Sequence, residues 1–310
     1  MVYYDINALP AFNNAVITIG TFDGLHKGHL KIIELMQIEA SKVKGETVII
    51  TFDPHPRQVV ATAQATLYLI NTLAEKIALL QKAGIDHLVV VPFTAAFANQ
   101  TAEAYISAFL VNTFHPHTII IGYDHRFGKN RSGDYHLLEA KAAEYQYQVK
   151  EIPVYMLQNI TISSTKIRSA ILQGDLDTVK LLLGYDYFFS GKVITGNQLG
   201  RTIGFPTANL QIDDEHKLVP GNGVYAVTIG SEENNMYNIK GMMNIGIRPT
   251  IDGSTRSIEV HIFDFNRDIY GTTLTITLIK HLRNEFKFNG LDELKAQLAK
   301  DKAEAIAVLG

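Results

Sequence analysis

The chain has 310 residues, 46% of them hydrophobic and 19% charged, and its 28 basic and 31 acidic residues give a net charge of −3. This length and composition predict two folded domains and exclude a disordered or fibrous protein. The near-neutral charge excludes an overall basic field that would recruit nucleic acid or anionic lipid, and the absence of cysteine excludes disulfides, thiolate nucleophiles, iron–sulfur clusters and thiolate zinc sites.

The N-terminal residues 1–14 lack the basic region and apolar core of a signal peptide, and no apolar run approaches the length of a membrane span. We therefore expect a soluble, cytoplasmic protein with neither a nucleic-acid nor a membrane partner. Any site for a polyanion should be local.

Short β-branched runs alternate with helical stretches over the first half of the chain. Strands are expected at residues 15–19, 46–52, 87–91, 118–121 and 149–154, and helices at 30–43, 72–83, 101–113 and 135–145. This alternation predicts an α/β fold with a parallel sheet covered by helices. Ligands of such sheets bind at the carboxyl ends of the strands.

The end of the first predicted strand carries the most informative motif, residues 19–29. The strand breaks at Gly20, and a short acidic turn leads to His26 and His29 at the start of a helix. Backbone N–H groups converge there, and cationic or hydrogen-bonding side chains beside them favour a phosphate site. The small Gly28 leaves room for a nucleotide against the backbone. Two polar cap residues on an ordinary turn are the plainer interpretation.

Three further segments carry chemically informative residues. Residues 51–57 and 122–128 follow the second and fourth predicted strands, and residues 162–168 place hydroxyl side chains at a helix N-terminus, followed by Arg168. Hydroxyls, N–H groups and a guanidinium together suit a triphosphate. Ordinary capping and proline-containing turns are the alternatives.

After Gly184 the pattern changes to strands separated by Gly-rich or polar turns. Strands are expected at 189–194, 224–229, 239–245, 257–265 and 272–282, followed by a helix at 291–308. This predicts a small β-barrel with a covering helix, and a domain boundary between residues 184 and 185.

The barrel half contains a glycine-rich segment at residues 196–210, whose backbone N–H groups could curl around phosphates. Thr207 and Asn209 offer oxygen atoms that suit Mg²⁺. On the strictly alternating strand 257–265, Glu259 and His261 share one face, so Glu259 is either a general base or a solvated carboxylate.

Three other patterns are not interpreted as sites. Residues 221–226 match the loose dinucleotide-binding pattern, but they open a strand where that motif must open a helix. No Gly-x-x-x-x-Gly-Lys-Ser/Thr loop occurs. The His115-Pro116-His117 segment lacks a third metal ligand nearby and is expected to be a surface turn.

The blocks at 20–29, 51–57, 122–128 with 131–134, and 162–168 resemble the nucleotidylyltransferase superfamily, specifically the adenylyltransferase half of bacterial bifunctional riboflavin kinase/FAD synthetases. The resemblance implies that residues 1–184 join FMN to AMP: the FMN phosphate attacks the α-phosphorus of ATP, and His26, His29 and Arg168 stabilise the developing charge as pyrophosphate leaves. The implied catalytic residues are His29 and Arg168. The chain departs from the family at His125, where phenylalanine is usual. The implied ATP-binding residues are Gly20, Phe22, Asp23, His26, Gly28, His29, Ser163, Ser164, Thr165 and Arg168, and the implied flavin-binding residues are Asp53, His55, Arg57, Asp124, His125 and Phe127.

The second half resembles riboflavin kinases through its glycine loop and Pro-Thr-Ala-Asn motif at 206–209. The resemblance implies that residues 185–310 phosphorylate riboflavin with Mg²⁺·ATP, that Thr207 and Asn209 position the metal, and that Glu259 activates the 5′-hydroxyl. The segment 284–288 and the last helix would close over the flavin. The implied ATP-binding residues are Gly196, Gly200, Arg201, Gly204, Pro206, Thr207 and Asn209, and the implied flavin-binding residues are Arg283, Glu285 and Phe288.

Two other classes of function stay open at the level of the sequence. One is a single-activity FMN adenylyltransferase whose barrel only binds flavin, and the other is a non-catalytic flavin store or sensor. Intact Thr207, Asn209 and Glu259 argue against the first. Riboflavin, FMN and ATP are the expected small-molecule partners, and a weak homo-oligomer stays open.

Overall fold

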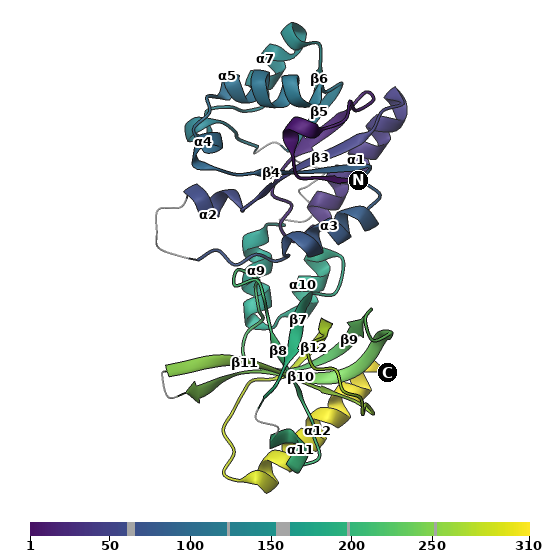
Figure 1. The fold of residues 1–310 in the computed structure, drawn as a ribbon, viewed down its shortest axis with the longest axis vertical. Helices are drawn as coiled ribbons and strands as arrows, with labels where there is room; N and C mark the ends of the chain where they lie inside the picture. The colour runs from purple at the N-terminus through teal and green to yellow at the C-terminus, as the bar shows by residue number, and fades with distance from the viewer. Residues whose placement is uncertain (61–65, 123–124, 153–161, 197–198, 251–252) are drawn as a thin grey trace. The chain divides into compact units, whose positions relative to one another are not determined.

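The computed structural model describes residues 1–60, 66–122, 125–152, 162–196, 199–250 and 253–310 (Figure 1). The chain forms two compact units, Met1–Ser163 and Ser164–Gly310. We expected the boundary between residues 184 and 185 instead, after the helices α9 (Ser164–Gln173) and α10 (Leu176–Leu183). That boundary stays a prediction.

The first unit contains a six-stranded sheet in the order β1-β4-β3-β2-β5-β6, and every neighbouring pair is parallel. This confirms the predicted parallel sheet. The short β1, which pairs with Leu88 and Val89, was not predicted. The strands are β1 (Val2–Tyr3), β2 (Val16–Ile19), β3 (Thr47–Asp53), β4 (His87–Pro92), β5 (Thr118–Gly122) and β6 (Gln148–Ile152).

Successive residues of the central strands enter two different cores. Ile17 and Ile50 contribute to one core, whereas Val16 and Ile49 contribute to the other. Buried strands of a parallel sheet are apolar on both faces for this reason. The first core also takes residues of η2 and α7, and the second takes residues of α1 and α3. The helical segments are η1 (Ile6–Ala8), α1 (Lys27–Val43), α2 (Pro56–Val60), α3 (Leu73–Lys82), α4 (Ala95–Ala98), α5 (Ala102–Ala104), η2 (Tyr105–Val111), α6 (Asn112–Phe114), η3 (Lys129–Arg131) and α7 (Tyr135–Tyr145).

The expectation of one α-helix over residues 101–113 was wrong. Its middle part, η2, is a π-helix, with short α-helical turns before and after it. The wider turn buries Tyr105, Ile106, Phe109 and Leu110 on one side. A π-helix is rare and is not signalled by apolar spacing, which explains the miss.

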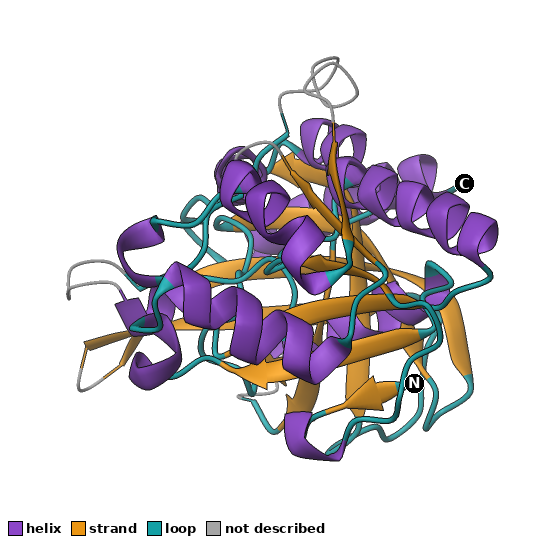
Figure 2. Cartoon of the chain, turned by 90° about the horizontal axis from the view of Figure 1, so that it is seen from above, coloured by secondary structure: helices purple, strands orange, loops and turns teal. Residues whose placement is uncertain are grey.

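The second unit contains a closed barrel in the strand order β10-β11-β8-β7-β12-β9, and α12 (Leu291–Leu309) contacts β9, β10 and β12. This confirms the predicted barrel and covering helix. Figure 2 shows the helices in purple and the strands in orange. Strand β8 was not among the predicted strands, and Gly223 opens β9 as expected. The strands are β7 (Phe188–Ile194), β8 (Ala208–Gln211), β9 (Gly223–Ser231), β10 (Met236–Thr250), β11 (Gly253–Ile262) and β12 (Thr273–Arg283), and α11 spans Leu199–Thr202.

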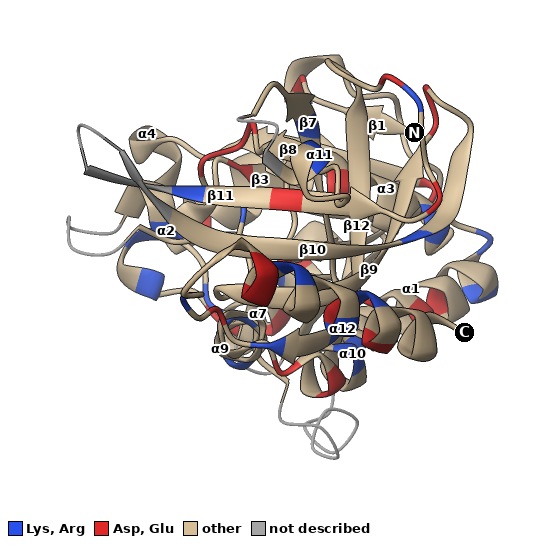
Figure 3. Ribbon diagram, turned by 90° about the horizontal axis from the view of Figure 1, so that it is seen from below, with Lys and Arg blue, Asp and Glu red and all other residues tan. Residues whose placement is uncertain are grey.

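Basic and acidic residues are interspersed along the helices, including α12 (Figure 3). Among the described segments, no helix has both the length and the apolar character that crossing a membrane requires.

Candidate active sites

The turn between β2 and α1 is tightly wound. Phe22 and Leu25 have φ values of 47° and 30°, and Gly24 has a φ of 89°. A Cβ atom on Gly24 would lie 2.9 Å from Cδ1 of Ile70, so both the backbone angle and the available space favour glycine. The turn therefore delivers His26 to the first position before α1 in a defined orientation.

His26 is the N-cap of α1, and its Nδ1 accepts a hydrogen bond from the backbone N–H of His29 at 3.3 Å. The two imidazole rings are stacked, with centroids 3.7 Å apart and planes 11° apart. A Cβ atom on Gly28 would lie 3.1 Å from Nδ1 of His26, so this glycine makes room for the ring of His26. The plainer interpretation, that His26 is a helix cap, is thus correct. It does not explain why the ring of His29 stacks on the ring of His26.

Burial keeps both imidazoles neutral. It lowers the pKa of His26 to about 4. Burial, followed by the repulsion that a protonated His26 and Lys76 would exert, holds the pKa of His29 well below its usual range. Of the cationic and hydrogen-bonding roles that the sequence suggested, the structure favours hydrogen bonding. Within the described residues, the buried Nδ1 of His29 has no hydrogen-bond partner, although the residue as a whole is only half-buried. An unpartnered buried polar atom is costly and often marks a functional position.

A buried lysine that we did not predict lies next to strand β3. Lys76 of α3 is 6% exposed, and its Nζ donates to Oγ1 of Thr51 at 3.4 Å. Burial lowers the pKa of Lys76, whereas the carboxylates of Asp23 and Asp53 act in the opposite direction. Lys76 occupies a core-facing position of its helix, one turn before the buried Leu80. A lysine in an apolar stripe was the signal that could have revealed it.

Asp23 links the histidine turn to the segment before α3. Its Oδ1 accepts hydrogen bonds from the backbone N–H groups of Ile70, at 2.9 Å, and Asn71, at 3.3 Å. The side chain is 1% exposed. A buried carboxylate bonded in this way holds the turn in place.

The segment that follows β3 is partly structural. Asp53 ends the strand, and the buried His55 accepts a hydrogen bond from the backbone N–H of Arg57 through its Nδ1 at 3.1 Å. The backbone N–H of His55 donates to Gln58 at 3.0 Å. His55 thus organises the start of α2, and the predicted flavin contacts of Asp53, His55 and Arg57 stay predictions.

The segment that follows β5 contributes to the core. Phe127 is 5% exposed and stacks on Tyr105, with centroids 4.9 Å apart. The ring of His125 lies 6.0 Å from that of Phe127, and Asp124 lies outside the described residues. Phe127 therefore packs the first core, and direct flavin contacts of these three residues stay predictions.

The residues Ser164, Thr165 and Arg168 lie on α9, which begins the second unit, and Ser163 is the last residue of the first. Their predicted role in binding ATP stays a prediction from the sequence.

The second candidate site is a cavity of about 360 Å³ in the barrel unit. Strand register places five of its lining residues in one row across neighbouring strands: Asn209 of β8, Glu259 of β11, Asn244 of β10, Val224 of β9 and Arg283 of β12. Residues paired in adjacent strands lie close to each other on one face. The barrel thereby collects polar groups that are up to 74 positions apart in the chain (283 minus 209).

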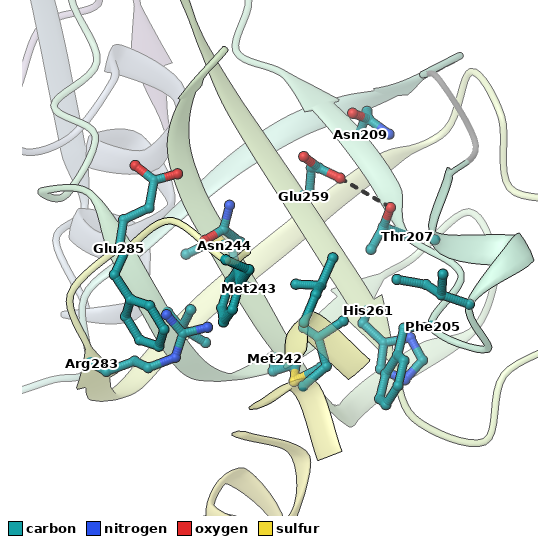
Figure 4. Close-up of a pocket in the computed structure, with 17 residues that line it drawn as sticks. Phe205, Thr207, Asn209, Met242, Met243, Asn244, Glu259, His261, Arg283 and Glu285 are labelled. Atoms are coloured by element: carbon teal, nitrogen blue, oxygen red, sulfur yellow. Dashed lines mark hydrogen bonds between the residues drawn. The ribbon is translucent and has the colours of Figure 1, made fainter. Parts of the chain in front are cut away.

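Glu259 and Thr207 meet on one side of this cavity (Figure 4). Oγ1 of Thr207 donates to Oε2 of Glu259 at 3.3 Å. His261 holds the segment before Thr207, because its ring Nδ1 lies 2.8 Å from the carbonyl oxygen of Pro206 and must donate to it. Burial is the main cause that lowers the pKa of His261, so this ring is neutral at pH 7. The predicted shared face of Glu259 and His261 is thus confirmed, since both line the cavity.

The glycines of the loop allow close approach. A Cβ atom on Gly196 would lie 2.2 Å from Nδ2 of Asn209, and one on Gly200 would lie 2.2 Å from the carbonyl oxygen of Phe205. Gly204 has a φ of 85°. Gly200, Thr207 and Asn209 line the cavity, whereas Gly196, Arg201, Gly204 and Pro206 do not.

Arg283 and Glu285 lie on the opposite wall (Figure 4), and Phe288 also lines the cavity; their flavin contacts stay predictions. The lining residues Met242, Met243 and Asn244 were not among the predicted site residues. Asn244 was detectable only through its register opposite Glu259, which requires the three-dimensional pairing.

Comparisons with known proteins agree with this two-site arrangement. Residues 9–166 match the family described as FAD synthetase, and residues 183–309 match the family described as riboflavin kinase. The chain is 38% identical to a bifunctional riboflavin kinase/FMN adenylyltransferase of Escherichia coli K12, over 95% of this chain and 93% of that protein. It is also 38% identical to the protein of the same name from Haemophilus influenzae, over 97% and 96%. A crystal structure described as a macrolide-efflux protein from Streptococcus pneumoniae superposes with a TM-score of 0.87 at 31% identity, and the match covers 98% of each chain.

Proposed function

This chain belongs to the family of bacterial bifunctional riboflavin kinases/FMN adenylyltransferases, and on that basis we propose which of its residues perform each reaction. The enzyme phosphorylates riboflavin to FMN and adenylylates FMN to FAD. ATP is the co-substrate of both steps. The cytoplasm as location, and the absence of a nucleic-acid or membrane partner, stay predictions.

For the kinase reaction we propose that Glu259 accepts the proton of the riboflavin 5′-hydroxyl as that oxygen attacks the γ-phosphorus of ATP. The observation that carries this proposal is the contact between Thr207 and Glu259 at 3.3 Å, beside Asn209 in the paired strand. A carboxylate inside a cavity and next to a phosphate-binding loop is suited to this role. Positioning of the two substrates would supply most of the acceleration.

We further propose that Thr207 and Asn209 hold Mg²⁺ at this site. The donor set fits the ion, because the Thr207 hydroxyl and the Asn209 amide oxygen are hard oxygen ligands, and both residues lie beside the Glu259 carboxylate of the paired strand. When bound, the ion would neutralise charge on the ATP phosphates. His261 keeps Thr207 in place through Pro206.

For the adenylyl transfer we propose that His26 and His29 act as neutral hydrogen-bond donors to the ATP phosphates. The supporting observation is the buried Nδ1 of His29, for which the described residues provide no partner. The FMN phosphate would attack the α-phosphorus directly, so no covalent enzyme intermediate is needed. Lys76, whose charge lowers the pKa of His29, would add positive charge near this ring. Arg168 keeps its proposed role on the strength of the sequence motif.

Product analysis tests both assignments at once. Purified protein is mixed with riboflavin, ATP and Mg²⁺, and flavins are separated by chromatography over time. We expect FMN to appear first and FAD to follow. FMN without FAD would contradict the adenylyltransferase assignment. Flavin that stays bound but unconverted would indicate a store or sensor, and conversion of added FMN but not of riboflavin would indicate a single-activity enzyme.

A further inference from the structure

The carboxylate of Asp301 is buried against Arg283, which lines the cavity proposed for the kinase reaction. Asp301 lies on α12 and is 2% exposed. Nε of Arg283 donates to both of its oxygens, at 2.9 and 3.1 Å, and Nη2 donates to Oδ2 at 2.7 Å. Gln297 donates to Oδ1 at 2.8 Å. This is a two-pronged, charge-assisted contact, and its geometry fixes the plane of the guanidinium.

The same guanidinium supports the aromatic segment that follows β12. Its central carbon lies 4.6 Å from the ring centre of Phe286 and 5.7 Å from that of Phe288. The two rings contact each other, with centroids 4.7 Å apart. Nη1 of Arg283 also donates to the carbonyl oxygen of Asn284 at 3.1 Å. Asp301 thus binds the edge of the Arg283 guanidinium, and Phe286 and Phe288 contact its face.

The residues on both sides of this contact line the cavity. Arg283, Phe286 and Phe288 do so from the strand end, and Leu294 and Leu298 do so from α12. The ion pair therefore joins two walls that are separate in sequence. Breaking it from the side of Asp301 would leave a partly buried guanidinium, 17% exposed, without its counter-charge.

We propose that Asp301 is a positioning residue of the riboflavin site, which acts through Arg283 to hold residues 284–288 as an aromatic wall for the flavin ring. The proposal rests on the kinase function assigned to this cavity. Asp301 itself touches no substrate in this account. Its loss should weaken flavin binding and leave phosphoryl transfer nearly unchanged, because Glu259 and Thr207 lie on the other side of the cavity.

The variant Asp301→Asn tests this proposal, because it keeps the volume and removes the charge. We expect the KM for riboflavin to rise about tenfold, which corresponds to about 1.4 kcal/mol. The turnover number should stay within about twofold, and FAD formation from FMN should not change. Glu304→Gln is the matched control, because Glu304 is an exposed carboxylate on the same helix. A KM unchanged in folded Asp301→Asn, or a fall in turnover number alone, would overturn the proposal.

Direct binding separates this proposal from the kinase assignment. Riboflavin fluorescence is titrated with wild-type protein and with each variant, so that affinity is measured without turnover. Weaker binding by Asp301→Asn supports the positioning role even if no FMN forms, whereas an equal affinity, or no binding by the wild type, overturns it. If circular dichroism shows that Asp301→Asn does not fold, Asp301→Glu decides. It keeps the charge but displaces the carboxylate from the two-pronged contact with Arg283, and the changed side chain does not line the cavity. It should raise the KM in the same way, and an unchanged KM would refute the proposal.

Discussion

The imidazole rings of His26 and His29 lie stacked with their centroids 3.7 Å apart, and burial holds both rings in the neutral form. Two adjacent imidazolium ions at this distance would repel each other strongly. In the proposed reaction the pair would therefore act through hydrogen bonds, with the amine of Lys76 close enough to influence the pKa of His29.

This geometry makes stability depend on pH through His26. The unfolded chain binds a proton on this ring below about pH 6.5, whereas the folded protein does so only below about pH 4. Stability should be fully present above pH 6.5 and should fall as the pH drops toward 4, by about 3 kcal/mol from this residue. Urea unfolding at several pH values measures it. His26→Asn retains a capping oxygen but cannot titrate, so its curve should be flatter between pH 6.5 and 4. Parallel curves for the two proteins would contradict the burial of a neutral His26.

His29→Ala should impair FAD formation and spare the kinase. If His29 donates to the reacting phosphates, its loss should cost about 2 to 4 kcal/mol of transition-state stabilisation, or roughly thirtyfold to a thousandfold in rate. Separate assays with FMN and with riboflavin as starting substrates measure the two reactions. His136→Ala is a control, since His136 is exposed on α7. A normal rate of FAD formation by His29→Ala would remove His29 from the site.

Lys76→Met should destabilise the first unit, because it leaves Asp23 buried without its neighbouring cation. Breaking a buried charge pair from one side costs about 3 kcal/mol. We expect chemical denaturation to show a loss of this size, together with slower FAD formation. The double variant Lys76→Met/Asp23→Asn should recover part of the stability, because the buried negative charge of Asp23 is removed as well. If the double variant is less stable than Lys76→Met by the full cost of Asp23→Asn alone, the two side chains are not coupled.

The sequence was sufficient where function and fold depend on local order. Alternating strands and helices predicted the parallel sheet, and the Pro-Thr-Ala-Asn motif predicted the positions of Thr207 and Asn209. It was insufficient where residues meet through tertiary pairing. Asn244 lines the cavity only because β10 pairs with β11 in one register, and Asp301 reaches Arg283 only because α12 packs beside β12. Neither relationship leaves a local pattern in the chain.

Helices α9 and α10 should be part of the smallest fragment that folds and acts as a kinase. Helix α10 contacts β12, and a Cβ atom on Gly221 would lie 2.2 Å from the carbonyl oxygen of Leu172 on α9. A fragment of residues 164–310 keeps these contacts, and it should fold and form FMN but not FAD. A fragment of residues 185–310 exposes the partners of Val179 and Leu183, which are fully buried in the whole chain. We expect its Tm to be lower by at least about 5 °C. Equal Tm values would place the boundary at residue 184, as first predicted.

Glu259→Gln should separate the two activities in the opposite sense to His29→Ala. The amide preserves the shape and can still accept a hydrogen bond from Thr207, but it cannot take the proton of the riboflavin hydroxyl. We expect riboflavin phosphorylation to fall by a factor of about 100 or more. FAD formation from supplied FMN should continue at the wild-type rate, because Glu259 belongs to the barrel. Glu215→Gln is the control, since the side chain of Glu215 is 89% exposed in the same unit. An equal loss of both activities would mean that Glu259 supports the fold rather than the chemistry. Normal phosphorylation would mean that Glu259 contacts the bound nucleotide but is not the general base of the reaction.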